Sequence, residues 1–244
     1  MYAFYRDPGA DGVGVAFSDA VAPDGAVLSL GGAHGAAGRP PGIARVEADL
    51  GVPLAVVRQV HGADVIVVDD DTDLAELATR SADALVTARA GVGLAVRVAD
   101  CVPVLLADPG AGVVAAAHAG RVGLAGGVLQ AAVAAMRAAG AATVTAWIGP
   151  HICGGCYEVP AAMADAVEAG VPGSRSTTRW GTAGLDLGAG ARGVLERLGV
   201  TVLDVGGCTL QAPDLHSHRR DAAASGRQAG IIWRADACRR EDAG

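Results

Sequence analysis

Two histidines and one cysteine are the residues whose types could together bind a metal ion. His61 ends one predicted strand run, Val56–Val60. His118 ends a second run, Val113–Ala117, and Cys101 lies between two more. Sheet proteins commonly build their sites where strands end, so these side chains could converge. From spacing alone, ordinary buried polar residues at strand ends explain the pattern equally well.

Two imidazoles and one thiolate form a ligand set that suits Zn²⁺. Three protein ligands leave a fourth tetrahedral position for water or substrate, which is typical of catalytic zinc sites. A single copper ion is the alternative, since this ligand set overlaps that of blue-copper centres.

Several residues next to these ligands are candidates for catalysis or substrate binding. Asp100 adjoins Cys101 and could transfer protons or orient a ligand, although aspartate is also typical of a turn cap. Arg58 and Gln59 precede His61 and are candidates for contacting substrate. Because neighbouring strand residues point to opposite faces, we expect at most one of the two to point at the metal.

The segment Ser217–Asp221 concentrates two guanidinium groups, Arg219 and Arg220, beside His218. Arginine forks match phosphate and carboxylate, so this segment is the preferred anion-binding element. The alternative is a solvated surface loop of arginine and aspartate.

Cys153 and Cys156 form a C-x-x-C pair with two glycines between them. Such a pair could be redox-active or part of a structural zinc site. No second pair completes a four-ligand site in the sequence, so we interpret both as incidental loop cysteines.

Composition and charge exclude several classes of protein. The net charge is −7 without a dominant basic cluster, so no nucleic-acid partner is expected. All nineteen basic residues are arginine, which excludes mechanisms that need a lysine nucleophile or a P-loop lysine. Aromatic residues make up only 3% of the chain although 51% is hydrophobic, so the core must consist mainly of small aliphatic side chains.

Hydropathy and cysteine usage predict a cytoplasmic protein with no membrane partner. The most apolar stretch, Val92–Ala107, is interrupted by Arg97 and Asp100 and is too short to span a bilayer. The N-terminus lacks a basic region followed by an apolar run, so no export signal is expected. Five cysteines without regular spacing favour a reducing compartment over a disulfide framework. The sequence leaves the oligomeric state open.

Hydrophobic periodicity predicts an α+β fold of α/β-like character, with mixed β-sheets packed against helices in one layered domain over residues 1–244. Residues 1–50 form a divergent N-terminal part, and residues 235–244 are expected to be a frayed tail. Strands are expected at 54–60, 64–68, 84–87, 93–98, 102–108, 113–117, 143–148, 200–205 and 230–234. Helices are expected at 43–50, 74–79, 124–139, 161–169 and 185–198.

A set of short motifs lies in order along the chain from about Leu54 to Trp233. They are Arg58–Asp64, Ala82–Thr87, Ala99–Val104, His118–Gly120, Ile148–Pro150, Cys156–Val159, Cys208–Thr209 and Ser217–Asp221. Together they closely resemble the laccase-domain family, whose members are variously called multicopper polyphenol oxidoreductases, purine nucleoside phosphorylases and peptidoglycan editing factors.

The resemblance implies that the metal ligands are the histidine of the QVHG motif, the cysteine of ADC and the histidine of HAG. These are His61, Cys101 and His118 in this chain. The family usually reads HAGWRG, whereas Arg121-Val122-Gly123 follows His118-Ala119-Gly120 here, so Arg121 is the candidate to replace the usual arginine. The family's N-terminal motifs are poorly kept within residues 1–50.

By resemblance, the leading functional hypothesis is a zinc-dependent purine nucleoside phosphorylase that accepts adenosine, inosine or methylthioadenosine, with an associated adenosine deaminase activity. Arg219 and Arg220 would hold phosphate, and Asp100 or Glu158 would handle protons.

Three alternatives stay open at this point. The first is a hydrolase that edits peptidoglycan precursors with the same metal chemistry. The second is a copper-dependent polyphenol oxidase, although six histidines in the whole chain are too few for a full multicopper cluster. The third is a binding protein whose site has decayed.

Overall fold

The computed structural model describes residues 1–31 and 40–236. The strands are β1 (Tyr2–Arg6), β2 (Val13–Ser18), β3 (Leu54–Ala55), β4 (Val65–Val68), β5 (Ala84–Thr87), β6 (Gly93–Val98), β7 (Val102–Asp108), β8 (Val113–Ala119), β9 (Thr145–Ile148), β10 (Arg175–Thr177), β11 (Ala183–Leu185), β12 (Thr201–Asp204) and β13 (Gln228–Arg234). The helices are α1 (Pro41–Leu50), α2 (Leu74–Leu77), α3 (Arg121–Ala125), α4 (Val128–Ala138), α5 (Ala161–Gly170), α6 (Leu187–Arg197) and α7 (His218–Asp221), with a 3₁₀ turn η1 (Ala222–Ala224).

Two mixed sheets form the centre of the fold. One has the order β1-β2-β13-β6-β3 and the other β12-β9-β7-β8-β5-β4, while β10 and β11 form a separate ribbon. The pairs β3–β6, β4–β5 and β9–β12 are parallel and the remaining pairs are antiparallel. The predicted α+β architecture of mixed sheets packed with helices is therefore confirmed.

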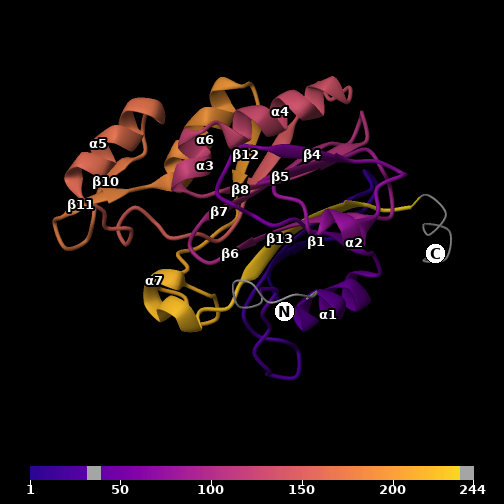
Figure 1. Cartoon of the computed structure of the whole chain (residues 1–244), viewed down its shortest axis with the longest axis horizontal. Helices are drawn as coiled ribbons and strands as arrows, with labels where there is room; N and C mark the ends of the chain where they lie inside the picture. Colours follow the sequence, from indigo (N-terminus) through magenta and orange to yellow (C-terminus); the bar gives the residue numbers. More distant parts are fainter. Residues whose placement is uncertain (32–39, 237–244) are drawn as a thin grey trace.

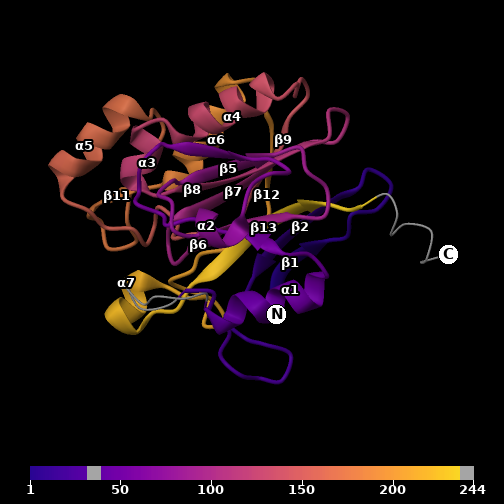
Figure 2. The same ribbon diagram turned by 45° about the vertical axis from the view of Figure 1, so that its right-hand side comes forward.

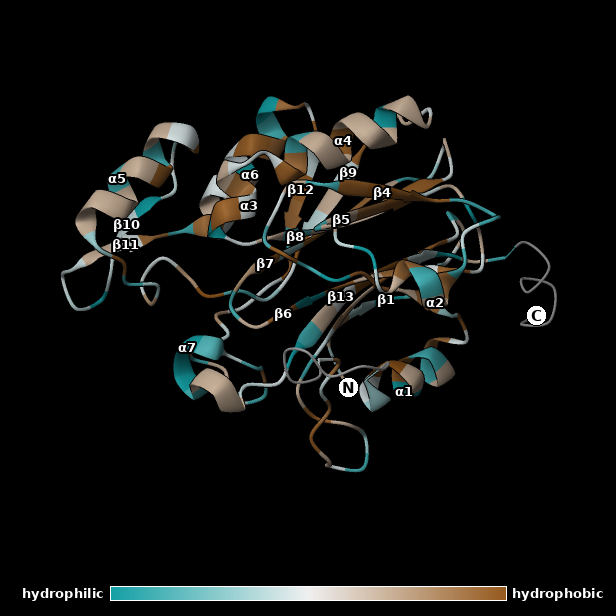
Figure 3. Ribbon diagram, in the orientation of Figure 1, coloured by the Kyte–Doolittle hydropathy of each residue, from teal (hydrophilic) through white to brown (hydrophobic). Residues whose placement is uncertain are grey.

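The sheets lie face to face between two helical layers. Two views show α4 and α6 on one side of the sheets and α1 on the opposite side (Figures 1 and 2). One buried cluster lies between the six-stranded sheet and α4 and α6, a second between the sheets, and a third between the five-stranded sheet and α1. Hydropathy follows this layering, since β4, β5 and β8 are strongly apolar whereas α7 is mostly hydrophilic (Figure 3).

Strand β8 explains why small aliphatic residues dominate the composition. All seven of its residues are buried. Val113, Ala115 and Ala117 belong to the cluster beneath the helices, whereas Val114 and Ala116 belong to the cluster between the sheets. A strand covered on both faces reads as a continuous apolar run, and alanine at these positions allows the layers to approach closely.

Several predicted elements differ from the structure by a few residues at their ends, and two differ more, for reasons that can be seen locally. The strand expected at 54–60 ends at Ala55, and the side-chain amide of Gln59 then takes the place of a strand backbone beside β6. Its Oε1 accepts from the Arg97 N–H and its Nε2 donates to the Arg97 carbonyl, both at 2.8 Å. The helix expected at 124–139 is divided into α3 and α4 at Gly127, whose φ of +91° is left-handed.

The N-terminal part contributes strands that the periodicity did not predict. Strand β2 is buried throughout and pairs with β1 on one side and β13 on the other. Its β-structure thus depends on residues more than two hundred positions away in the chain. Of the expected tail, residues 237–244 lie outside the described residues. No helix among residues 1–31 and 40–236 is long and apolar enough to cross a membrane.

Asp108 at the end of β7 gives a test of this framework. Its buried carboxylate accepts from the backbone N–H groups of Ala111, Ala142 and Thr143 at 3.1, 2.7 and 2.8 Å. Replacing Asp108 by alanine should lower the free energy of unfolding by about 2–4 kcal/mol, since these donors lose a charged acceptor. Chemical denaturation at neutral pH measures this, with Asp70→Ala, an exposed aspartate, as the control.

The same variant should change the acid dependence of stability. Burial alone would raise the pKa of Asp108, but the N–H groups of Thr143, Ala111 and Ala142 hold it below its usual value. A lowered pKa in the folded state stabilises the fold above the usual pKa, and that contribution is lost as the pH falls through the folded-state pKa. The difference in the free energy of unfolding between wild type and Asp108→Ala should therefore become smaller in acid. A difference that does not change with pH would contradict this account.

Candidate metal centre

The structure brings the three predicted ligands together. The ligand atoms of His61, Cys101 and His118 all lie within 4.8 Å of one another. Cys101 Sγ is 3.8 Å from His61 Nε2, and the two imidazole rings meet edge to face with centroids 4.7 Å apart. Residues separated by up to 57 positions thus form one constellation of two imidazoles and a thiol.

Each ligand comes from a different local structure. His118 lies within β8, opposite Pro103 of β7, one residue before the strand ends. His61 lies in the loop between β3 and β4 and has a left-handed φ of +61°. Cys101 follows Asp100, whose φ is +87°. Left-handed backbone is uncommon for residues other than glycine, so these two conformations must be held by surrounding contacts.

The carboxylate of Asp83 supplies the contacts that hold two of the ligands. It is fully buried, and its Oδ1 accepts from His118 Nδ1 at 2.8 Å and from the His61 N–H at 2.9 Å. Its Oδ2 accepts from the N–H groups of Val60 and Gly62 at 3.2 and 2.6 Å. With its proton on Nδ1, His118 presents Nε2 as a lone pair, which is the usual arrangement of a metal-binding histidine.

Electrostatics at the site also suit a cation. Burial raises the pKa of Cys101, but hydrogen bonds and charge interactions with His118 and His61 outweigh this and lower it to about 6. Burial lowers the pKa of His118, but Asp83 and Cys101 raise it to about 9. These shifts favour a thiolate at Cys101 and a positive charge at His118, beside the Asp83 carboxylate. A metal cation can take the place of that charge, and the thiolate is the form that binds metal.

Glycine at position 120 is required by the packing of the ligands. A Cβ there would lie 2.7 Å from His61 Cδ2 and 3.1 Å from Cys101 Sγ. A Cβ at Gly123 would lie 2.6 Å from the carbonyl oxygen of Gly62. The glycine of the HAG motif thus leaves room for the ligands, and the next turn of α3 packs directly on the His61 loop.

Asp100 connects the Cys101 loop to α7. Its Oδ1 accepts from the Thr209 hydroxyl at 2.6 Å, and its Oδ2 accepts from the Arg219 N–H at 2.6 Å. Both oxygens therefore have partners within the chain. Orientation of a ligand and proton transfer by Asp100 both stay predictions.

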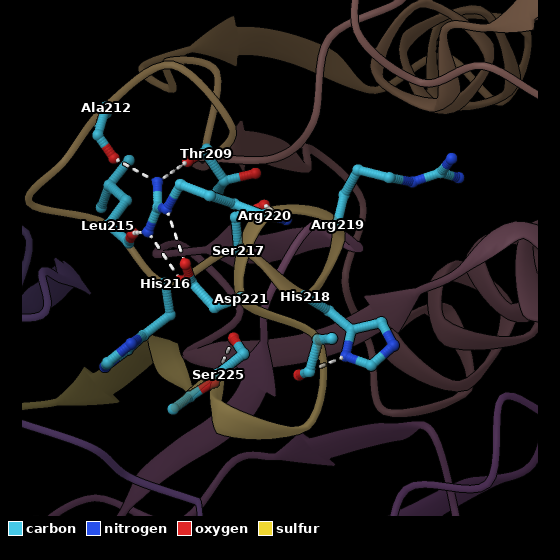
Figure 4. A network of polar contacts seen from close by, with 12 residues as sticks. Thr209, Ala212, Leu215, His216, Ser217, His218, Arg219, Arg220, Asp221 and Ser225 are labelled. Atoms are coloured by element: carbon cyan, nitrogen blue, oxygen red, sulfur yellow. Dashed lines mark hydrogen bonds and ion pairs between the residues drawn. The ribbon is translucent and has the colours of Figure 1, made fainter.

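The two arginines of α7 are placed differently. The guanidinium of Arg220 donates to the carbonyls of Thr209, Ala212 and Leu215 and pairs with Asp221 (Figure 4). The Arg219 side chain extends away from this network, and its guanidinium carbon lies 5.1 Å from the centre of the Tyr157 ring. Arg220 therefore fixes the loop, whereas the guanidinium of Arg219 lies outside this network, and anion binding by either arginine stays a prediction.

Three other predicted site residues have contacts of their own. Arg58 is exposed and donates from Nε and Nη2 to the Ser81 hydroxyl at 3.0 and 2.8 Å. Gln59 holds the edge of β6. Glu158 is exposed and forms an isolated backbone bridge to Gly184. None of these contacts places the three in the metal cluster, and their roles in binding or catalysis stay predictions.

Asp83, Gly120 and Tyr157 are the residues that reasoning from the sequence left without a role. Asp83 and Tyr157 lie in two of the recurring motifs, which marked their segments but not their functions. A buried aspartate just before a strand would have been the available signal for Asp83, because a buried carboxylate needs donors close by.

A family model described as "Multi-copper polyphenol oxidoreductase laccase" matches residues 42–235. The chain belongs to this family. It is a family of metal-binding proteins, and the described residues provide a cluster fit for a metal ion. The comparison does not distinguish one metal from another.

Curated relatives cover most of the chain. A purine nucleoside phosphorylase of Streptomyces griseus is 50% identical over 214 residues, which cover 84% of this chain and 86% of the relative. A purine nucleoside phosphorylase of Mycobacterium tuberculosis is 48% identical over 196 residues, covering 78% of this chain and 77% of the relative.

A solved structure, that of a Neisseria meningitidis protein, has a TM-score of 0.76 at 34% identity and covers 96% of this chain and 99% of its own. YlmD of Geobacillus stearothermophilus has a TM-score of 0.75 at 28% identity, with coverage of 95% and 94%.

The contacts of Asp83 predict how the centre responds to mutation. Asp83→Asn keeps the size of the side chain but removes the charge that orients His118 and the His61 loop. We expect zinc affinity to fall about 10- to 100-fold, as is typical when the hydrogen-bond partner of a metal ligand is lost. Competition with a chromophoric chelator measures this. Asp64→Asn, at an exposed position in the same loop, is the matched control and should bind zinc like wild type.

Proposed function

We propose that this chain is a zinc-dependent purine nucleoside phosphorylase whose metal is held by His61, Cys101 and His118. The observation that carries the proposal is a cluster of two histidines and a cysteine that could hold a metal ion, in a chain 50% identical to a phosphorylase of that name. Adenosine, inosine and methylthioadenosine are the proposed substrates, together with inorganic phosphate.

The reaction breaks the bond between the anomeric carbon of the ribose and a purine nitrogen. A phosphate oxygen bonds to that carbon, and the purine leaves with a proton. The bound zinc would supply a Lewis acid at its open coordination position. The chain itself must bind phosphate, orient the nucleoside and deliver the proton.

Arg219 is the residue we assign to phosphate. Its backbone is fixed by Asp100, its guanidinium lies over the Tyr157 ring, and no hydrogen bond of that guanidinium occurs within the described residues. Guanidinium groups bind phosphate through paired N–H donors. Arg121 is the second candidate, because it follows Gly120 directly at the start of α3 and is half-exposed.

Asp100 is then a positioning residue. Its carboxylate connects the Cys101 loop to Thr209 and Arg219, and so sets the distance between metal and phosphate. Proton delivery by Glu158 and substrate contacts from Arg58 and Gln59 remain part of the proposal. Adenosine deamination is included as well, since nucleobase deaminases also use zinc held by histidine and cysteine.

The direct test supplies purified protein with inosine and phosphate and follows hypoxanthine and ribose 1-phosphate. We expect phosphate-dependent turnover that is lost in Cys101→Ala, because the thiolate ligand is removed. Parallel assays use a serine-bearing muramyl precursor and a phenol with oxygen. If only the muramyl precursor is turned over, the proposed phosphorylase activity is wrong and the chain is an editing hydrolase.

Metal analysis of protein prepared without added copper tests the ion. Zinc at the site agrees with the proposal, whereas copper with a thiolate-to-copper absorption band and phenol oxidation would replace it with an oxidase.

The role assigned to Arg219 predicts a specific kinetic change. Arg219→Ala should raise KM for phosphate about 10- to 100-fold, the effect of losing charge-assisted hydrogen bonds, with a smaller effect on KM for inosine. Steady-state kinetics with phosphate as the varied substrate measure it. Arg175→Ala, which removes an exposed arginine paired with Asp165, is the control. An unchanged KM for phosphate in Arg219→Ala would exclude this role.

A further inference from the structure

Three more cysteines converge outside the centre described above. The Sγ atoms of Cys153, Cys156 and Cys208 all lie within 4.8 Å of one another. The sequence pattern had paired the first two and found no partner for them. The fold supplies the third, because the segment after β12 passes beside the turn that follows β9. The C-x-x-C pair is therefore part of a three-thiol cluster.

The backbone on both sides of the cluster is fixed by hydrogen bonds. The N–H groups of Cys156 and Tyr157 both donate to the Cys153 carbonyl, at 2.9 and 3.0 Å, and close the turn. The segment around Cys208 is held to His151 by one bond on each side, from the His151 N–H to the Gly207 carbonyl and from the Thr209 N–H to the His151 carbonyl. The sulfurs are thus held close together without a covalent bond.

Two hydrogen-bond donors point at these sulfurs. The Cys153 N–H donates to Cys208 Sγ at 3.5 Å, and Gln211 Nε2 donates to Cys156 Sγ at 3.2 Å. Cys156 is buried, and the other two are half-buried. Donors aimed at sulfur are what a cluster of thiolate ligands needs, because they offset the negative charge of the ligands.

We propose that Cys153, Cys156 and Cys208 form a second metal site for a thiophilic ion, Zn²⁺ or Cu⁺. Thiolates select these ions over harder cations. Zinc–sulfur bonds of about 2.3 Å place tetrahedral thiolates about 3.8 Å apart. Small side-chain rotations would bring these three sulfurs to that spacing. A disulfide would join only two of them and leave the third without a partner.

The ion has a route to the site and a place for a fourth ligand. Cys153 and Cys208 line a cavity of about 600 Å³, which His151, Asp186 and Arg192 also line. A cavity that reaches the ligands provides the entry path that a metal site requires. The fourth coordination position is assigned to a water from this cavity.

The second site is connected to the first through one residue. Thr209 follows Cys208 directly, and its hydroxyl donates to Asp100, the neighbour of Cys101. Its carbonyl accepts from Arg220 in the loop that carries Arg219. An ion on Cys208 thereby stabilises the segment that sets the position of Asp100 and of α7.

Metal stoichiometry of the full chain tests the proposal. Reduced protein is loaded with Zn²⁺ in one arm and Cu⁺ in another, and bound metal is measured after gel filtration. Wild type should bind a second ion beyond the one at Cys101, so Cys101→Ser and Cys208→Ser should each lose about half of the metal and the double variant should lose nearly all. Binding in either arm supports the site, and the arm identifies the ion.

Cobalt gives an independent readout. The thiolate-to-cobalt absorption of Cys101→Ser, which keeps all three thiols of the second cluster, should exceed that of Cys208→Ser, which keeps Cys101 at the first site but only two thiols at the second. Cys153→Ser, at a half-buried position, serves as the second variant if Cys208→Ser does not fold. The two sites are measured separately. If the Cys101 site binds no metal, a loss of bound metal in Cys208→Ser still reports on the three-cysteine site.

Two results would overturn the proposal. One is a complete loss of bound metal in Cys101→Ser, which would mean that the wild type binds metal at the Cys101 site alone. The other is a Cys153–Cys208 or Cys153–Cys156 disulfide, found by mass spectrometry in protein purified under reducing conditions and persisting after exposure to metal.

Discussion

The carboxylate of Asp83 is fully buried and yet surrounded by donors, with the His118 ring on one side and three consecutive backbone N–H groups on the other. A buried anion is unfavourable without such partners, and here the partners are a metal ligand and the loop that carries another ligand. One side chain thus sets both the orientation of an imidazole in a rigid strand and the left-handed turn at His61. The geometry of the centre depends on this group, because it hydrogen-bonds both to the ring of His118 and to the backbone of His61.

The sheets provide the rigidity that this arrangement needs. His118 lies in β8, which is flanked by β5 and β7 and covered by apolar layers on both faces. The small residues that fill these layers leave little freedom for β8 to shift. Asp83 directly precedes β5, the neighbour of β8, so the interaction between Asp83 and His118 joins adjacent strands at one end of the sheet. The other parts of the site lie outside these strands, in the loops that carry His61 and Cys101 and in α7.

Predictions from the sequence succeeded where the information is local. Strands β5, β6 and β7 have the expected bounds because continuous β-branched runs flanked by turn residues define them. The cluster of His61, Cys101 and His118 was anticipated because short motifs surround each of the three residues. Strand β2 was missed because one of its partners is β13, at the other end of the chain, and β1 was missed with it because β1 pairs with β2. Long-range contacts, which no local pattern encodes, determine three further features. These are the role of Asp83, the difference between Arg219 and Arg220, and the convergence of Cys208 with Cys153 and Cys156.

The side chain of Gln59 has a consequence for solubility. Strand β3 pairs with β6 over only two residues, so most of one side of β6 would otherwise be an open edge. Exposed edges with free N–H and carbonyl groups recruit strands from other molecules and lead to aggregation. By bonding both backbone groups of Arg97, Gln59 closes that edge with an amide that cannot extend the sheet further. The loop that carries His61 therefore also satisfies the backbone of β6 at Arg97, close to the metal centre.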